Sequence, residues 1–251
     1  MKRLLGLSVA GIVAVGVGVW AQQSRSSNTV PDGDWRTINR DPAANRYSPL
    51  KQITATNVSS LKEAWTTPLG GGATSVPLVV NGVMYVSSGN RVVALDGDTG
   101  KEMWAHTLQP VAAPPPAAPP TDAQAPARGG GGRGRGGAPA GPTASARGVG
   151  YWPGDEKFSP RILFMSGNRL IAVDAATGVL VDTFGEKGVV TVGVPYGGTP
   201  TIYRNVAIIG AASGEIPQGP PGNPRAFDVV TGKKLWEFWT VPRPGEKYNE
   251  T

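Results

Sequence analysis

The sequence predicts an all-β protein built from repeated four-stranded antiparallel sheets, and a recurring sequence unit is the main reason. One copy, Ala-Phe-Asp-Val-Val-Thr-Gly-Lys-Lys-Leu-Trp, occupies residues 226–236, and an earlier copy occupies 94–104. A third, partial copy at 172–180 lacks the tryptophan. A unit that returns along a chain in this way is typical of a repeat architecture.

Each part of this unit has a structural explanation. The aspartate can accept backbone N–H groups of the turn that follows it, and the glycine provides the positive φ that a tight turn needs. Trp104 and Trp236 lie far enough along the next strand to reach a neighbouring sheet. A single copy would fit an ordinary hairpin with a core tryptophan, but three copies favour the repeat. We therefore interpret Asp96, Asp174 and Asp228 as structural rather than catalytic residues.

The spacing of turn signals predicts the strands. Around the first full copy we expect four strands in about thirty residues, with Asn81-Gly82 as a hairpin turn. A meander of this size is typical of a β-propeller blade. For the second sheet we expect Phe184 in the place of the missing tryptophan. The expected strands are 77–80, 83–87, 92–96 and 101–106, then 161–166, 170–174 and 179–184, then 201–203, 206–210 and 225–239.

About three blades are therefore predicted. Propellers close with four to eight blades, and three would leave open sheet edges. We expect the chain to be part of a larger propeller, or to pair with another chain.

Composition excludes several classes of site and partner. The 251 residues include 36 glycines, 24 prolines and no cysteine, which excludes disulfides and thiolate metal sites. The formal net charge is +6. Much of this excess lies in the first residues and in one arginine-containing run, so we expect no nucleic-acid partner.

The first residues have the pattern of an export signal. Lys2 and Arg3 precede an uncharged apolar stretch at 4–20, and small residues allow cleavage after Ala21. An uncleaved membrane anchor is the alternative, because seventeen residues are at the short limit of a spanning helix. Residues 22–33 form a polar tether. In both cases we expect a periplasmic protein, exported or anchored at the outer face of the inner membrane.

The remaining organisation follows from composition. Residues 34–108 contain the amino-terminal strands and the first blade, and 148–251 contain further blades. Between them, 109–147 is rich first in Pro and Ala and then in Gly and Arg, and it cannot build a core. Its Arg-Gly tract resembles RNA-binding segments, but in an exported protein a solvated surface insertion is the favoured interpretation.

Several segments together resemble the pyrroloquinoline quinone (PQQ) dependent alcohol and glucose dehydrogenases, which are eight-bladed quinoproteins. The resemblance covers about 34–251 without the insertion and is nearer to the membrane-associated, glucose-dehydrogenase-like branch. Besides the recurring unit, the motifs that carry it are Asp34-Trp35, Arg40-Asp41-Pro42, Arg46-Tyr47-Ser48-Pro49-Leu50 and Tyr151-Trp152-Pro153-Gly154-Asp155.

The resemblance also implies site residues. Arg147 matches an arginine that contacts the quinone, and a planar bidentate cation suits a flat anionic cofactor. Thr199 resembles a threonine that contacts the cofactor. Ser213, Gly214 and Glu215 resemble a Ser-Gly-Ala-Glu segment with one residue missing, which makes Glu215 the candidate Ca²⁺ ligand.

The implied activity is oxidation of an alcohol or sugar (glucose-like) hydroxyl with PQQ and Ca²⁺, with ubiquinone or a cytochrome as the electron acceptor and with membrane association. The family's catalytic aspartate is expected beyond Thr251, so no catalytic residue is identified. The alternative is a non-catalytic propeller scaffold that binds partner proteins in the cell envelope. In the enzyme, Arg147 and Glu215 should face one funnel.

Overall fold

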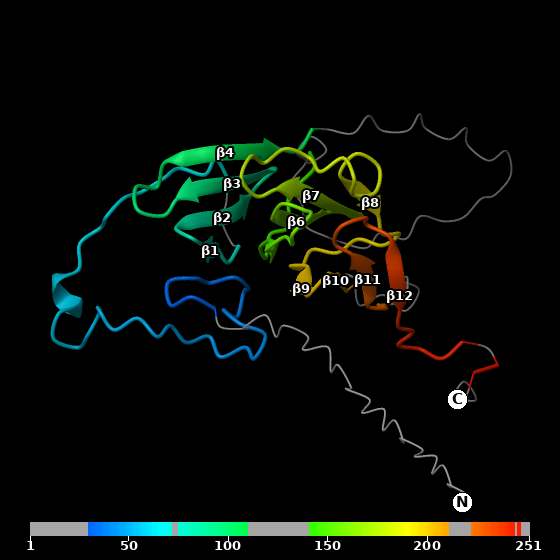
Figure 1. Ribbon diagram of the computed structural model, residues 1–251, viewed down its shortest axis with the longest axis horizontal. Coiled ribbons are helices and arrows are strands. Elements are labelled where there is room, and N and C mark those ends of the chain that lie inside the picture. Colours follow the sequence, from blue (N-terminus) through cyan, green and yellow to red (C-terminus); the bar gives the residue numbers. More distant parts are fainter. Residues whose placement is uncertain (1–29, 72–74, 110–140, 211–221, 244, 247–251) are drawn as a thin grey trace, which may run out of the picture.

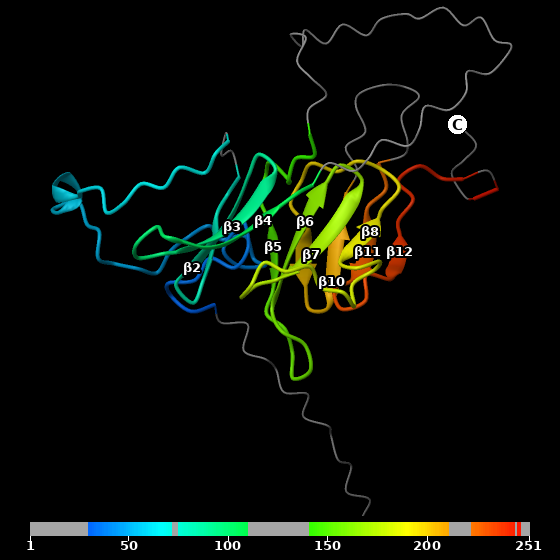
Figure 2. The same ribbon diagram turned by 90° about the horizontal axis from the view of Figure 1, so that it is seen from above.

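Three four-stranded antiparallel sheets lie side by side in the computed structural model, in the order of the chain (Figures 1 and 2). The structure describes residues 30–71, 75–109, 141–210, 222–243 and 245–246. Each sheet is a meander in which consecutive strands pair. This is the blade arrangement of a β-propeller, and it confirms the fold class and the three predicted blades.

The first sheet follows the prediction to within one residue at each strand end. Its hairpin turn has Asn81 and Gly82 at positive φ, as a two-residue turn of this type requires. A bulge between Ala94 and Leu95 brings the chain into the Asp-Thr-Gly turn. The strands are β1 (Leu78–Val80), β2 (Val83–Ser88), β3 (Arg91–Asp96) and β4 (Glu102–Thr107).

The second sheet differs from the prediction at its first and last strands. The prediction of a strand at 179–184 is wrong, because the chain makes only an isolated bridge, Val173–Leu180, and then turns. The paired fourth strand starts later, at Val189, and the first strand, 150–152, was missed. The strands are β5 (Gly150–Trp152), β6 (Arg161–Ser166), β7 (Arg169–Asp174) and β8 (Val189–Thr191).

The third sheet has the predicted first two strands. The predicted span 225–239 divides into two strands around the Asp-Thr-Gly turn. The strands are β9 (Thr201–Tyr203), β10 (Val206–Ile209), β11 (Arg225–Asp228) and β12 (Lys234–Glu237).

Two apolar clusters hold the sheets together. One lies between the first and second sheets and includes Leu78, Val92 and Phe164, all with no exposed surface. The other lies between the second and third sheets and includes Phe184 and Phe227. The central strands are buried on both faces, which explains why β6 reads as a continuous apolar run rather than an alternating one.

The tryptophan of one sheet docks on the Asp-Thr-Gly turn of the next. The Trp104 Nε1 donates to the Ala175 carbonyl oxygen at 3.0 Å, and a Cβ at Gly178 would overlap the indole ring. Tyr85 donates its hydroxyl to the same oxygen at 3.2 Å, and burial raises the pKa of Tyr85 to about 12. His106 Nδ1 lies 3.0 Å from the Gly178 oxygen. The recurring unit is therefore a docking device between sheets.

The amino-terminal segment supplies a docking tryptophan for the first sheet. Trp65 Nε1 donates to the Gly97 carbonyl oxygen at 3.1 Å, and Trp35 pairs with Val79 beside β1. The only helix among the described residues is the 3-10 turn Val58–Ser60. Trp236, the tryptophan of the third copy, is 44% exposed.

In the described part of the chain, no helix is long and apolar enough to span a bilayer. The predicted leader, residues 1–21, and most of the predicted insertion lie outside that part.

Candidate functional site

The chain segments that lead into β1, β5 and β9 meet at the end of the sheets opposite the Asp-Thr-Gly turns, here called the loop end. Val76 forms a parallel bridge with Gly148, and its N–H donates to the Arg147 carbonyl oxygen at 3.4 Å. A Cβ on Gly148 would lie 3.2 Å from Thr199 Oγ1. The structure therefore brings Arg147 and Thr199 into adjacent positions, although 51 residues separate them in sequence.

Serine hydroxyls fix these segments to one another. Ser75 Oγ donates to the Ser87 carbonyl oxygen at 2.8 Å, and Ser87 Oγ donates to the Ser145 carbonyl oxygen at 2.6 Å. Ser145 Oγ in turn lies 2.8 Å from the Gly198 carbonyl oxygen. Three hydroxyls thus connect all three sheets at the loop end. These hydrogen bonds fix the backbone next to Arg147, at Ser145, and next to Thr199, at Gly198.

Arg147 presents an unpaired cation at this place. Its residue is exposed, and within the described ranges no hydrogen bond, ion pair or ring contact joins its guanidinium to another side chain. Every other described arginine has such a partner. For example, Arg36 pairs with Asp34, and Arg91 pairs with Glu102. An unpaired guanidinium in a fixed backbone setting is suited to an anionic ligand.

Thr199 contributes a buried hydroxyl without a partner. Its Oγ1 is inaccessible to solvent and makes no hydrogen bond with a described residue. Buried polar groups are nearly always hydrogen-bonded, and an unsatisfied one costs about 1–3 kcal/mol. A polar ligand that accepted this hydrogen bond would remove that cost. The pair of an orphan hydroxyl and an unpaired cation therefore fits a cofactor with carboxylate and carbonyl oxygens.

Thr199 also lines a pocket of about 260 Å³ on the inner side of β5 and β9. The amino-terminal segment closes this pocket with Arg36, Asn39 and Asp41. Tyr151 is part of the wall, and burial raises the pKa of its phenol. The pocket is mostly apolar between these polar groups, as is usual for sites that bind flat organic molecules.

Three predicted site residues, Ser213, Gly214 and Glu215, lie outside the described residues. The last described position before them, Gly210, packs on Tyr196, and Tyr196 N–H donates to the Gly167 carbonyl oxygen at 3.1 Å. Among the described residues, no group of three or more His, Cys, Asp or Glu side chains could hold a metal ion. The prediction that Glu215 binds Ca²⁺ therefore stays a prediction.

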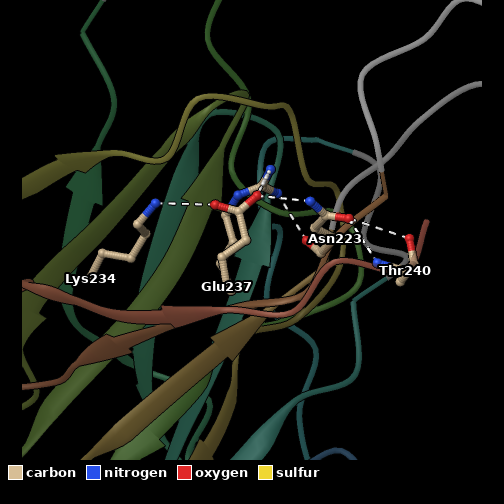
Figure 3. Close-up of polar contacts among 5 residues, drawn as sticks. Asn223, Lys234, Glu237 and Thr240 are labelled. Atoms are coloured by element: carbon tan, nitrogen blue, oxygen red, sulfur yellow. Dashed lines mark hydrogen bonds and ion pairs between the residues drawn. The ribbon is translucent and has the colours of Figure 1, made fainter. Parts of the chain in front are cut away.

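A buried polar network follows residues 211–221 in the chain, and no sequence pattern predicts it (Figure 3). Arg225 and Glu237 form an ion pair at 2.9 Å, with side chains only 8% and 15% exposed. Asn223, fully buried, donates to Glu237 Oε1 at 2.9 Å and accepts from the Thr240 N–H at 3.1 Å. Lys234 Nζ lies 3.1 Å from Glu237 Oε2. The network fixes the chain where it returns to β11.

This network predicts a pH dependence of stability. The hydrogen bond from Asn223, followed by Lys234 and the charge of Arg225, lowers the pKa of Glu237 below its ordinary value of 4.5. Because the folded state holds the carboxylate more strongly than the unfolded state, its contribution is complete above pH 4.5 and is lost as the pH falls through the lowered pKa. We expect the difference in unfolding free energy between wild type and Glu237→Gln to shrink below that pH. A difference that is constant down to about pH 2, well below the ordinary pKa, would contradict this.

Comparison with known proteins shows the family of the chain. Residues 35–251 match the PQQ family described as glucose/ethanol/alcohol dehydrogenase, beta-propeller domain. The chain is 34% identical over 265 residues to the dehydrogenase subunit of alcohol dehydrogenase (quinone) from Gluconobacter oxydans, covering 98% of this chain and 31% of that protein. It is 31% identical to methanol dehydrogenase [cytochrome c] subunit 1 from Methylobacterium organophilum, covering 95% of this chain and 34% of that protein.

A solved structure of a quinohemoprotein alcohol dehydrogenase has a similar fold. Quinohemoprotein alcohol dehydrogenase from Comamonas testosteroni superposes with a TM-score of 0.61 at 28% identity, covering 86% of this chain and 28% of that one. The chain thus spans about a third of the length of these relatives.

Proposed function

This chain belongs to the PQQ glucose/ethanol/alcohol dehydrogenase β-propeller family, and from this premise we propose that it supplies part of the cofactor site of a quinoprotein alcohol dehydrogenase. The observation that carries the proposal is the convergence at the loop end. Arg147, whose guanidinium is unpaired among the described residues, directly precedes Gly148. Gly148 lies so near the orphan hydroxyl of Thr199 that an added Cβ would be 3.2 Å from it. A scaffold propeller has no need for either feature.

The proposed roles follow from the chemistry of each group. Arg147 binds a carboxylate or carbonyl edge of PQQ through charge-assisted hydrogen bonds, and Thr199 donates its buried hydroxyl to a second oxygen. Ser213 and Gly214 complete the cofactor contacts, and Glu215 binds Ca²⁺ as a hard oxygen ligand. When bound, the quinone supplies the two-electron acceptor for the oxidation of a hydroxyl group.

The substrate and partners of the whole protein are part of the same proposal. Relatives named as alcohol and methanol dehydrogenases support a small alcohol as substrate. A glucose-like sugar hydroxyl is the finer alternative. We propose ubiquinone or a cytochrome as electron acceptor, and export to the periplasm, with membrane association, on the basis of the leader-like residues 1–21.

Replacement of Arg147 by alanine tests the cofactor role. A hydrogen bond to a charged group is worth about 1.5–3 kcal/mol, so we expect Arg147→Ala to weaken PQQ binding by about 10- to 100-fold. The measurement is titration of the full-length apo-protein with PQQ, followed by protein fluorescence. Arg204→Ala is the matched control, because Arg204 lies at the opposite end of β9 and stacks on Tyr203. Equal affinities of Arg147→Ala and wild type would refute the proposed function.

A further inference from the structure

The second sheet has no tryptophan at the position that docks on the Asp-Thr-Gly turn of the third sheet. Its one tryptophan, Trp152 on β5, instead donates its Nε1 to Asn205 Oδ1 in the turn between β9 and β10, at 3.1 Å. In the first and third sheets the docking tryptophan pairs with an alanine of the preceding strand, Ala94 with Trp104 and Ala226 with Trp236. In the second sheet the corresponding Ala172 donates its N–H to the Gly188 carbonyl oxygen at 2.9 Å. The Ala172 carbonyl oxygen accepts in turn from the Val181 N–H at 3.0 Å. Gly188 and Val181 therefore lie opposite Ala172 in place of a tryptophan, and neither carries an indole.

A different side chain reaches the turn of the third sheet. At each of the other turns, the carbonyl oxygen of the residue after the aspartate accepts an indole N–H. In the third sheet that residue is Val229, and its oxygen accepts from Arg161 Nη1 at 2.9 Å. The same nitrogen lies 2.7 Å from the Val230 carbonyl oxygen. We infer that Arg161 is the docking residue of this junction and replaces the missing tryptophan.

The surroundings of Arg161 support a docking role. The residue is only 3% exposed, and its guanidinium stacks at 5.4 Å on the ring of Trp152 and at 5.5 Å on the ring of Phe158. Arginine combines hydrogen-bond donors with a planar stacking surface, as the indole of tryptophan does. Phe184, expected from the sequence to replace the tryptophan, is buried in the apolar cluster between the second and third sheets. A Cβ at Gly232 of the third turn would meet Val190 and Gly185, however, and not the Phe184 ring.

The charge of Arg161 is tolerated without an ion pair. No carboxylate of the described residues lies within ion-pair distance, and burial lowers the pKa of the guanidinium while Asp228, Asp155 and Asp174 raise it. Two carbonyl oxygens satisfy donors on one side. Thr183 Oγ1 lies 3.5 Å from Arg161 Nη2 on the side where Arg161 lines a cavity of about 530 Å³. These hydrogen bonds offset part of the cost of burying the charge.

This junction joins the sheet that carries Arg147 to the sheet that carries Thr199. Arg161 therefore acts as a positioning residue for the cofactor site, and this part of the inference rests on the proposed function. Two other contacts cross this turn, and each replaces only part of the contact that an indole ring would make. Gly185 N–H donates to the Thr231 carbonyl oxygen at 2.9 Å, and Val190 packs on Gly232.

Arg161→Met in the full-length protein tests both parts. Amide exchange at Gly185, which reports on this junction, should accelerate by about tenfold or more, because a charged hydrogen bond is lost. Exchange at Gly178 and Gly100, which lie under Trp104 and Trp65, should stay unchanged. Arg161→Lys keeps the charge without the planar fork and should give an intermediate rate. Arg169→Met, which loses one 3.4 Å bond to Ser166, is the control.

The possible outcomes separate the two claims. Unchanged exchange at Gly185, or equal acceleration at all three amides, would overturn Arg161 as the docking residue. Local acceleration together with PQQ affinity weakened by about tenfold would support docking and positioning. Local acceleration with unchanged PQQ affinity would overturn the positioning role alone. If the wild type does not bind PQQ, the proposed function fails, and the exchange data still decide the docking claim.

Discussion

Replacement of Trp104 by alanine is expected to lower the free energy of unfolding by about 3 kcal/mol. Large-to-small changes of tryptophan cost about 3–5 kcal/mol in a core, and the lower value applies because Trp104 is partly exposed. The variant loses the contact with Gly178 and leaves the Ala175 carbonyl oxygen with only the Tyr85 hydroxyl. Urea denaturation with an unchanged m-value would measure the loss.

Met103→Ala is the matched control for this prediction. Met103 is the neighbour of Trp104 on β4, but its side chain is 56% exposed, so we expect a change of about 0.5 kcal/mol or less. Trp104→Phe keeps a ring and removes the N–H donor, and it should cost about 1 kcal/mol from the hydrogen bond. If Trp104→Ala were no more destabilising than Met103→Ala, the recurring unit would not be a docking device.

Glu237→Gln is expected to destabilise the fold by about 2–3 kcal/mol. Removal of one partner of a buried ion pair costs about 3–5 kcal/mol, because the other charge stays buried, and the residual exposure of Glu237 reduces this. Arg225 would lose its carboxylate, and Asn223 would face an amide that can present either an oxygen or a nitrogen. Thermal or urea unfolding at pH 7 measures the effect.

Glu102→Gln makes the same chemical change in an exposed ion pair. Arg91 and Glu102 have side chains that are 28% and 41% exposed, so we expect a cost below about 0.5 kcal/mol. Equal effects of the two substitutions would show that burial does not strengthen the Arg225–Glu237 network.

Local sequence signals predicted most of the fold. The hairpin turn at Asn81-Gly82 and the three Asp-Thr-Gly turns depend on residues within one turn of each other, as the bonds from the Thr99 N–H and Oγ1 to Asp96 Oδ1 at 2.8 and 2.6 Å show. The strand at 179–184 was predicted wrongly because its composition fits a strand. Whether this segment forms a strand depends on whether its backbone N–H and C=O groups form hydrogen bonds with β7 or with solvent. No local sequence pattern predicts that choice.

The candidate site was predictable only in part. The family resemblance predicts Arg147 and Thr199 as candidate site residues, but their adjacency depends on Gly148 and on hydroxyl contacts between segments more than fifty residues apart. The network of Asn223, Arg225 and Glu237 had no signal, since each of its residues is ordinary for an exposed loop or strand edge. The network contributes to stability because its side chains are buried. Their burial results from the packing of the assembled sheets.

For the recurring unit, some features are determined by the sequence alone and others only by the tertiary structure. The sequence alone determined that the aspartate and glycine make a turn and that a tryptophan follows, because turn geometry is a local property of the backbone. Only the tertiary structure decided what each turn receives from its neighbour. The first two turns receive Trp65 and Trp104, and the third receives Arg161 from a different strand. Docking depends on which side chain fills the space between two packed sheets, so a missing tryptophan can be replaced from elsewhere in the chain.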